Sequence, residues 1–216
     1  MVEKLGLRDR KKAQTRDRIA DVAAVLFARD GYEAVSVRDV ADAAEVSDQT
    51  VYNYFPAKQD LVLDRVDEFL VLYRTAILDA SDGVSPAAAV HPLVLKDIDR
   101  YRGADPVTAR GEFPAQCVES PVLRRFSLEF REKQVRTVAA AIVGKNPTLE
   151  PIVATAHAAA LVSVSQSVTD SIGTSILDGG PDEEFADELA RIAAVAFDDL
   201  DRFFRHTTIS RERRNT

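Results

Sequence analysis

Apolar residues recur along most of this 216-residue chain at the three- and four-residue spacing of an α-helix. The clearest run is Ile19, Val22, Ala23, Leu26 and Phe27, which falls at i, i+3, i+4, i+7 and i+8 and forms one stripe. No stretch shows the sustained period-two alternation of a half-buried β-strand. The pattern therefore predicts an all-α fold.

Glycine and proline residues divide the helical pattern into segments. Helices are predicted at residues 13–30, from 37, at 48–54, as a long helix from 58, and at 87–101, 121–143, 149–177 and 182–205, with a short, broken helix at 107–119. The segments group into two expected domains. Residues 1–58 form a three-helix head with a basic N-terminal arm, and residues 59–216 form a larger helical bundle.

The segment SVRDVADAAEVSDQTVYNYFPAK, residues 36–58, predicts two short helices joined by a tight turn. Ser36 and Ser47 are expected to cap them, with Asp39 completing a near capping box. The second helix turns Val51 and Phe55 inward, and the three neighbouring residues 52–54 cannot all face inward with them. This is the layout of a helix-turn-helix, whose second helix enters the major groove of DNA.

Several residues at fixed offsets make the segment specific. They are Phe27, Gly31-Tyr32, the run Ser36-Val37-Arg38-Asp39-Val40-Ala41, Val46-Ser47, the run Thr50-Val51-Tyr52-Asn53-Tyr54-Phe55, and Lys58. With these residues the segment resembles the tetracycline-repressor-like (TetR) family of bacterial transcription regulators. The resemblance covers about the first quarter of the chain. One departure is Glu45, at a turn position where many family members have glycine.

The resemblance implies DNA contacts from the recognition helix, the start of the fourth helix and the second helix. The matching positions are Arg38, Ser47, Gln49, Thr50, Tyr52, Asn53, Tyr54 and Lys58. Their side chains suit the task, because amides read adenine, while hydroxyls and a lysine at a helix N-terminus suit phosphates. For Arg38, an ordinary solvated surface position is the alternative.

The net charge of −7 is distributed unevenly. Residues 1–18 hold seven basic and three acidic side chains, and residues 1–58 as a whole are neutral, so residues 59–216 carry the negative charge. A basic arm on an acidic body orients its N-terminus toward an anion such as DNA. A purely solubilising flank is the alternative.

The family resemblance implies that residues 59–216 bind a small molecule and form a homodimer. Stripes of small and apolar residues on the last two helices are candidates for the dimer contact: Ala158, Leu161, Ser165, Ala193, Phe197, Leu200 and Phe204. The alternative is that both stripes serve only the core of the monomer.

Candidates for the ligand site are large or polar residues within otherwise apolar helices. They are Phe69, Tyr73, His91, Tyr101, Phe113, Gln116, Cys117, Phe126, Phe130, His157 and Gln166. The alternative for each is an ordinary core position, and a lone histidine such as His157 is more often a bonded core residue than a ligand contact.

Enzyme chemistry finds no support in the sequence, and no metal or cofactor is expected. His91, His157 and His206 lie far apart without metal-ligand spacing, and no glycine-rich phosphate loop is present. The lone Cys117 has no catalytic signature, and together with an N-terminus unlike a signal peptide it predicts a cytoplasmic protein. The alanine-rich stretch 152–168 is too polar for a membrane span.

The predicted function is that of a sequence-specific transcription regulator, a repressor that a small molecule releases from a palindromic operator in double-stranded DNA. The alternative is a helical, dimeric, protein-binding adaptor with a vestigial DNA motif. A sequence-specific DNA binder protects a palindrome and loses affinity steeply with salt, whereas an adaptor has no preferred site.

Overall fold

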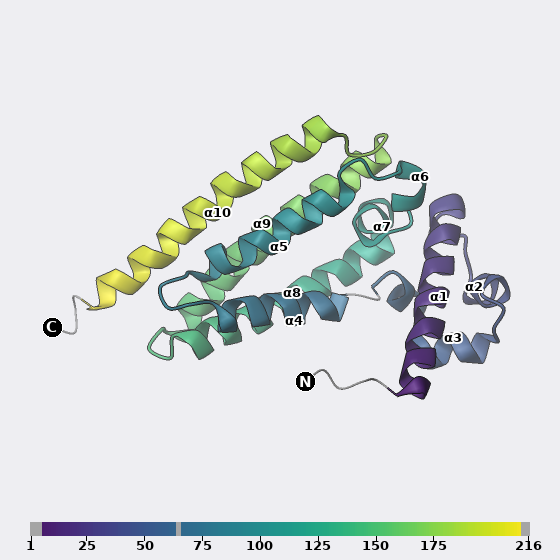
Figure 1. The fold of residues 1–216 in the computed structure, drawn as a ribbon, viewed down its shortest axis with the longest axis horizontal. Helices are drawn as coiled ribbons and strands as arrows, with labels where there is room; N and C mark the ends of the chain where they lie inside the picture. Colours follow the sequence, from purple (N-terminus) through teal and green to yellow (C-terminus); the bar gives the residue numbers. More distant parts are fainter. Residues whose placement is uncertain (1–5, 64–65, 213–216) are drawn as a thin grey trace.

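The computed structural model describes residues 6–63 and 66–212, and within these ranges every element is a helix, as predicted. A head made of α1 (Leu7–Asp30), α2 (Val37–Ala43) and α3 (Asp48–Tyr54) lies at one end of an elongated body (Figure 1). The body contains α4 (Val66–Asp79), α5 (Pro86–Tyr101), α6 (Pro106–Ala109), α7 (Phe113–Glu119), α8 (Pro121–Lys145), α9 (Pro151–Leu177) and α10 (Glu183–Glu212). A short 3₁₀-helix, η1 (Lys58–Leu61), follows the head.

The head is built around the apolar stripe of α1. Ile19, Ala23 and Phe27 are buried there in one cluster with Val51 and Phe55, the two residues that were predicted to face inward. α1 begins earlier than residue 13, so the basic arm from Arg8 onward is part of the helix. Residues 1–5 of that arm lie outside the described ranges.

The long helix predicted from residue 58 is wrong in its first part, because η1 ends at Leu61 and α4 begins only at Val66. The apolar residues along this stretch serve two different cores. Leu61 and Val62 lie in the core of the head, although the sequence assigned them to the second domain, whereas Tyr73 and Ile77 lie in the core of the body.

α9 is the central helix of the body and packs against α5, α7, α8 and α10. By length and composition alone it is apolar enough to cross a membrane. In the fold its small residues instead permit close packing within the chain. A Cβ added at Gly173 would lie 2.3 Å from the carbonyl oxygen of Pro114 in α7, so only glycine fits there.

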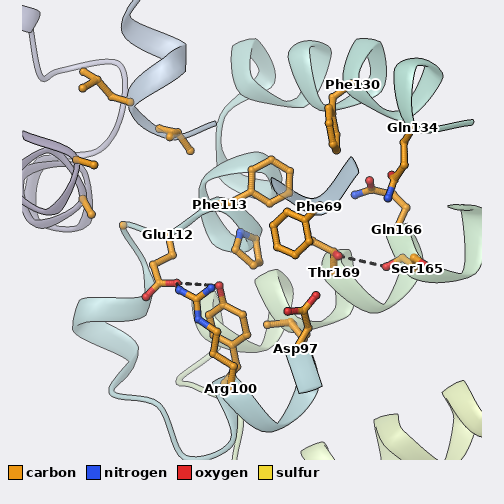
Figure 2. A pocket seen from close by; sticks show the side chains of 18 of the residues that line it. Phe69, Asp97, Arg100, Glu112, Phe113, Phe130, Gln134, Ser165, Gln166 and Thr169 are labelled. Atoms are coloured by element: carbon orange, nitrogen blue, oxygen red, sulfur yellow. Dashed lines mark hydrogen bonds and ion pairs between the residues drawn. The ribbon is translucent and has the colours of Figure 1, made fainter. Parts of the chain in front are cut away.

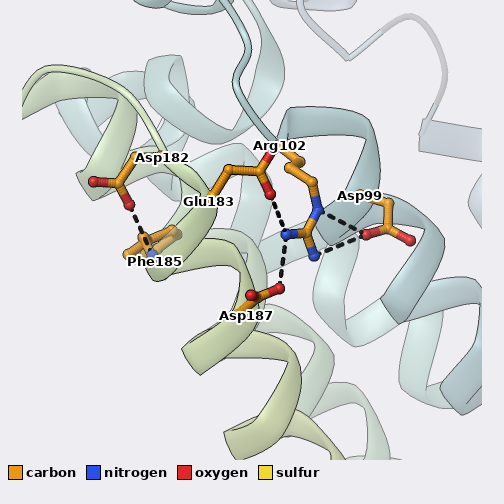
Figure 3. A network of polar contacts seen from close by, with 6 residues as sticks. All are labelled: Asp99, Arg102, Asp182, Glu183, Phe185 and Asp187. Carbon is orange, nitrogen blue, oxygen red and sulfur yellow. Dashed lines mark hydrogen bonds and ion pairs between the residues drawn. The ribbon is translucent and has the colours of Figure 1, made fainter.

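Arg102, directly after α5, links that helix to the start of α10 (Figure 3). Its guanidinium donates hydrogen bonds to Glu183 at 2.8 Å and Asp187 at 2.7 Å, and to Asp99 of α5 at 3.2 Å. A cation is also favourable at the C-terminal end of a helix. The network holds the C-terminal half of α5 in place, and that half carries side chains of the cavity described below.

Candidate nucleic-acid interface and ligand cavity

Local capping fixes the geometry of α2 and α3. The Ser36 hydroxyl accepts a hydrogen bond from the Asp39 backbone N–H, and the Asp39 carboxylate accepts one from the Ser36 N–H at 2.7 Å, which confirms the capping box. The Ser36 hydroxyl also donates to this carboxylate at 2.6 Å, and this bond, followed by the one from the Ser36 N–H, lowers the pKa of Asp39. Ser47 caps α3 through the Thr50 N–H at 3.1 Å. Glu45 in the turn has a φ of 53°, so this chain adopts a left-handed conformation there without glycine.

The outer face of α3 presents Gln49, Tyr52 and Asn53 to solvent. Tyr52 is 47% exposed, and the Gln49 side-chain amide donates to the Asn53 amide oxygen at 3.1 Å, one helical turn away. This hydrogen bond leaves further donors and acceptors of both amides free for a partner. The outer face of α3 is therefore a polar surface of the kind that reads base edges.

Three other candidates for DNA contact are less exposed than this face. The Thr50 hydroxyl is half-buried and lies 2.8 Å from the Ser47 hydroxyl, and Tyr54 packs partly against the core of the head. Lys58 donates to the backbone carbonyl of Tyr32, and its ammonium lies 4.1 Å from the centre of the Tyr32 ring. Burial lowers the pKa of Lys58. This lysine thus holds η1 against the end of α1.

Basic residues of α1 extend the exposed surface beyond α3. Arg8, Lys11 and Lys12 line a shallow depression that Tyr54 of α3 closes on one side. The sequence predicted the basic arm but not its position beside the recognition helix, because that position depends on how α1 crosses α3 (Figure 1). Arg38 of α2 is also exposed and lies 3.9 Å from Asp42, which is a weak surface pair.

A cavity of about 200 Å³ lies where the head meets the body (Figure 2). Ala20, Asp21 and Ala24 of α1 form its wall on the head side, together with Leu61 and Val62. The body contributes residues from α4, α5, α8, α9 and the segment Gly111–Pro114, namely Phe69, Tyr73, Asp97, Arg100, Tyr101, Gly111, Glu112, Phe113, Pro114, Phe130, Gln134, Ser165, Gln166, Thr169 and Ile172. A ligand bound here would touch both parts of the molecule.

Hydrogen bonds fix one side of the cavity around Glu112. Its carboxylate accepts from Arg100 at 2.7 Å and from the Tyr101 hydroxyl at 2.8 Å. Burial, and then the negative charge of Glu112, raise the pKa of Tyr101. On another wall, burial raises the pKa of Tyr73 to about 12. Both tyrosines therefore stay neutral and are hydrogen-bond donors at neutral pH.

Six of the residues predicted for the ligand site line this cavity. They are Phe69, Tyr73, Tyr101, Phe113, Phe130 and Gln166. Two of these aromatic residues, Phe69 and Phe113, lie next to each other in Figure 2.

The other five ligand candidates do not line the cavity. Gln116 is buried and donates to the Arg110 carbonyl at 2.7 Å, and Cys117 lies in the core of the head, where burial raises its pKa to about 12. His157 packs edge-on against Phe204, with ring centres 4.3 Å apart, and burial lowers its pKa. His91 stacks on Phe197 at 4.8 Å. Phe126 is half-buried in α8 and not among the lining residues.

The sequence missed the charged residues of the cavity and most of its other polar residues. Asp97, Arg100 and Glu112 lie on segments whose charged residues match an ordinary solvated surface. Gln134 and Thr169 give no sequence signal beyond a polar residue at a position facing inward. Only the approach of α5, α8, α9 and the segment before α7 to the same space gives these side chains a shared site.

The residues predicted for the dimer contact lie in or against the chain's own core. Ala158, Leu161, Ala193, Phe197 and Phe204 are at most 4% exposed, and Leu200 packs against the same cluster. Ser165 is also buried and lines the cavity. Burial within the single chain favours the alternative interpretation, in which the stripes serve the core of the monomer.

The helix-turn-helix segment matches a known family model. Residues 19–64 match the model described as "Bacterial regulatory proteins, tetR family". Among curated relatives, the chain is 32% identical to the transcriptional regulator TcmR of Streptomyces glaucescens over 46% of the chain and 44% of TcmR. It is 39% identical to the repressor KstR2 of Rhodococcus jostii over 43% of the chain and 48% of KstR2. The chain thus spans less than half the length of these two relatives.

Solved structures match over most of the chain. A TetR-family regulator from Streptomyces coelicolor A3 is 21% identical, with a TM-score of 0.54 over 88% of this chain and 96% of that one. NalD of Pseudomonas aeruginosa, the secondary repressor of the MexAB-OprM multidrug efflux pump, is 18% identical, with a TM-score of 0.56 over 85% and 97%. At this level of identity the likeness establishes a shared fold.

Proposed function

The chain belongs to the tetR family of bacterial regulatory proteins, and from that premise we propose that it is a DNA-binding transcriptional repressor released by a small molecule. It is not an enzyme, and it acts in the cytoplasm, where its DNA target lies. The observation that carries the proposal is the surface around α3. The capped helix exposes Gln49, Tyr52 and Asn53 beside the basic start of α1.

The operator is tested by selecting binding sites from randomised duplex DNA with the full-length protein. We expect a palindrome, because two copies of α3 must read half-sites about one DNA turn, ~34–36 Å, apart. Affinity for the selected site should fall steeply with salt concentration, since basic side chains displace counterions. Selection of no preferred sequence would instead support the protein-binding adaptor.

Substitutions in α3 separate two kinds of DNA contact. Tyr52→Ala should weaken binding to selected and random DNA by a similar factor, because we assign the phenol to the phosphate backbone. Asn53→Ala should relax preference at one base-pair position, with a loss of about 1–3 kcal/mol of discrimination. Binding to an operator panel with each position changed in turn measures both effects. If Asn53→Ala lost the same affinity for operator and for random DNA, Asn53 would not have the base-reading role that we assign to it.

A second copy of the chain is the proposed partner in the dimer. Ile192, Val195 and Phe203 of α10 are 50%, 53% and 56% exposed, and they lie on one side of the helix. Phe203 also contacts His157 edge-on at 5.0 Å, so this apolar stripe lies beside α9. We assign the dimer contact to the stripe, in place of the buried residues that the sequence suggested.

Charge introduced into this stripe should separate the dimer. Val195→Glu is expected to shift the protein toward monomers in analytical ultracentrifugation, because an unpaired carboxylate is costly to bury in an interface. Operator affinity should fall with it, since a monomer reads a single half-site. Val71→Glu is the matched control, because Val71 of α4 is 62% exposed and outside the stripe. A dimer that is equally stable in both variants would rule out the α10 stripe.

Ligand control is proposed to act through the cavity between head and body. Because α1 forms one wall and α4, α5, α8 and α9 form others, a ligand that prefers a different spacing of these walls moves the head. A coupling of ~1–3 kcal/mol lowers operator affinity about 5- to 150-fold, which suffices for a switch. Titration of the protein–operator complex with a cavity ligand tests this coupling.

A further inference from the structure

Asp97 is the acidic side chain of α5 that borders the cavity, and its carboxylate points inward near Phe69 and Thr169 (Figure 2). It is largely withdrawn from solvent, and no described residue donates a hydrogen bond to it. A partly buried carboxylate without a donor is unfavourable in the empty protein. Its presence is explained most simply by a partner that enters the cavity.

The charges around the cavity favour a positive partner. Its lining holds three carboxylates, Asp21, Asp97 and Glu112, and one cation, Arg100. Arg100 is already paired with Glu112 at 2.7 Å, and its guanidinium stacks over the Tyr101 ring at 5.2 Å. The charge of Arg100 is thus balanced by its neighbour, and the charge of Asp97 is left without a direct partner in the cavity.

Aromatic rings surround the space in front of Asp97. They are supplied by four separate helices: Phe69 and Tyr73 by α4, Tyr101 by α5, Phe113 by α7 and Phe130 by α8. Aromatic faces attract cations and also accommodate the apolar part of a ligand. The volume of about 200 Å³ is smaller than that of typical drug-sized sites, which favours a compact molecule.

We propose that the cavity binds a compact organic cation, with its ammonium group against the Asp97 carboxylate and its apolar part among the aromatic rings. The assignment rests on the proposed function, because it identifies the class of effector that controls the repressor. Gln134, Gln166 and Ser165 also line the cavity and provide hydrogen-bonding groups that select among such cations.

The pH dependence of binding follows from the position of Asp97. Burial raises the pKa of Asp97 to about 6, and the charges of Arg100 and then Lys96 oppose that rise. A permanently charged cation should therefore bind fully above about pH 7 and lose affinity as the pH falls through 6. Other titratable groups around this side chain are Asp21 of α1, Tyr73 of α4, Tyr101 of α5 and Glu112. The described lining residues of α8 and α9 are uncharged.

The test compares benzyltrimethylammonium with its neutral isostere, neopentylbenzene, by isothermal titration calorimetry, a method suited to a chain without tryptophan. We expect the cation to bind at least about tenfold more tightly than the isostere at pH 7.5, and more weakly at pH 5. Asp97→Asn should reduce cation affinity at least about tenfold and remove the pH dependence. Asp21→Asn is the matched control and should change affinity much less, because Asp21 lies on the exposed wall.

Several outcomes would overturn the cation site. They are equal affinity for the two probes, equal losses in Asp97→Asn and Asp21→Asn, or no binding of either probe. Asp97→Asn should be at least as stable as the wild type at pH 7.5, since a carboxyl with a raised pKa costs stability once ionised. The pH series on the wild-type protein does not depend on any variant. Operator binding without a probe is measured in parallel, so failure of the repressor proposal is seen separately from failure of the cation site.

Discussion

Gly111→Ala is expected to lower the free energy of unfolding by about 3 kcal/mol. A Cβ at this position would lie 1.9 Å from the carbonyl oxygen of Ala24 in α1 and 2.7 Å from its carbonyl carbon. Because both atoms belong to the backbone, no side-chain rotation relieves the clash. The segment before α7 must then move away from α1, which opens the wall of the cavity. Urea denaturation followed by far-UV circular dichroism measures the change.

Gly144→Ala is the matched control for this substitution. Gly144 lies near the end of α8, and an added Cβ there would lie 3.4 Å from a Leu78 methyl carbon, an ordinary van der Waals contact. Its stability should be unchanged or raised by up to about 1 kcal/mol, because alanine favours the helix. Equal stability of the two variants would show that Gly111 does not pack closely against the Ala24 backbone of α1.

Phe55→Ala is expected to cost about 3–5 kcal/mol and to abolish DNA binding. Phe55 is 1% exposed in the core of the head, and the Arg16 guanidinium lies 4.9 Å from the centre of its ring. The loss should be local, because the body has a separate apolar cluster. Hydrogen exchange should therefore show faster exchange in peptides from α1 to α3 while peptides from α9 stay protected.

Tyr52→Ala is the control, because Tyr52 lies in α3 only three residues before Phe55, which follows the end of that helix. Since Tyr52 is exposed, its removal should change stability by no more than about 0.5 kcal/mol while DNA affinity falls. Together the two variants separate the inner face of α3, which holds the head together, from its outer face, which we assign to DNA. Retention of operator binding in Phe55→Ala would show that the head tolerates loss of its central ring.

The sequence predicted the helix-turn-helix closely because its determinants are local. The caps at Ser36 and Ser47 act on backbone groups three residues away, and the bounds of α3 match the predicted ones. The apolar pattern likewise revealed that α9 and α10 each have a buried face. It could not reveal what covers that face, so Phe197 and Phe204 were assigned to a partner although they lie in the core of the monomer.

The cavity shows the opposite case. Its aromatic residues stand out in the sequence, but Asp97 and Glu112 look like any solvated carboxylate, and their surroundings come from helices far away along the chain. The prediction of one long helix from residue 58 was also wrong in its first part. A stripe of apolar residues does not show that its two halves pack into different cores.

The sequence alone determined the helical class, the capped pair of helices in the head and the outward orientation of Gln49, Tyr52 and Asn53 on α3, because spacing and capping act within a few residues. Only the tertiary structure decided which buried faces meet, where the basic start of α1 lies, and which charged side chains enclose a common space. Those features depend on contacts between residues distant in the chain, such as Ala24 with Gly111 and Pro114 with Gly173, and no local pattern encodes such contacts.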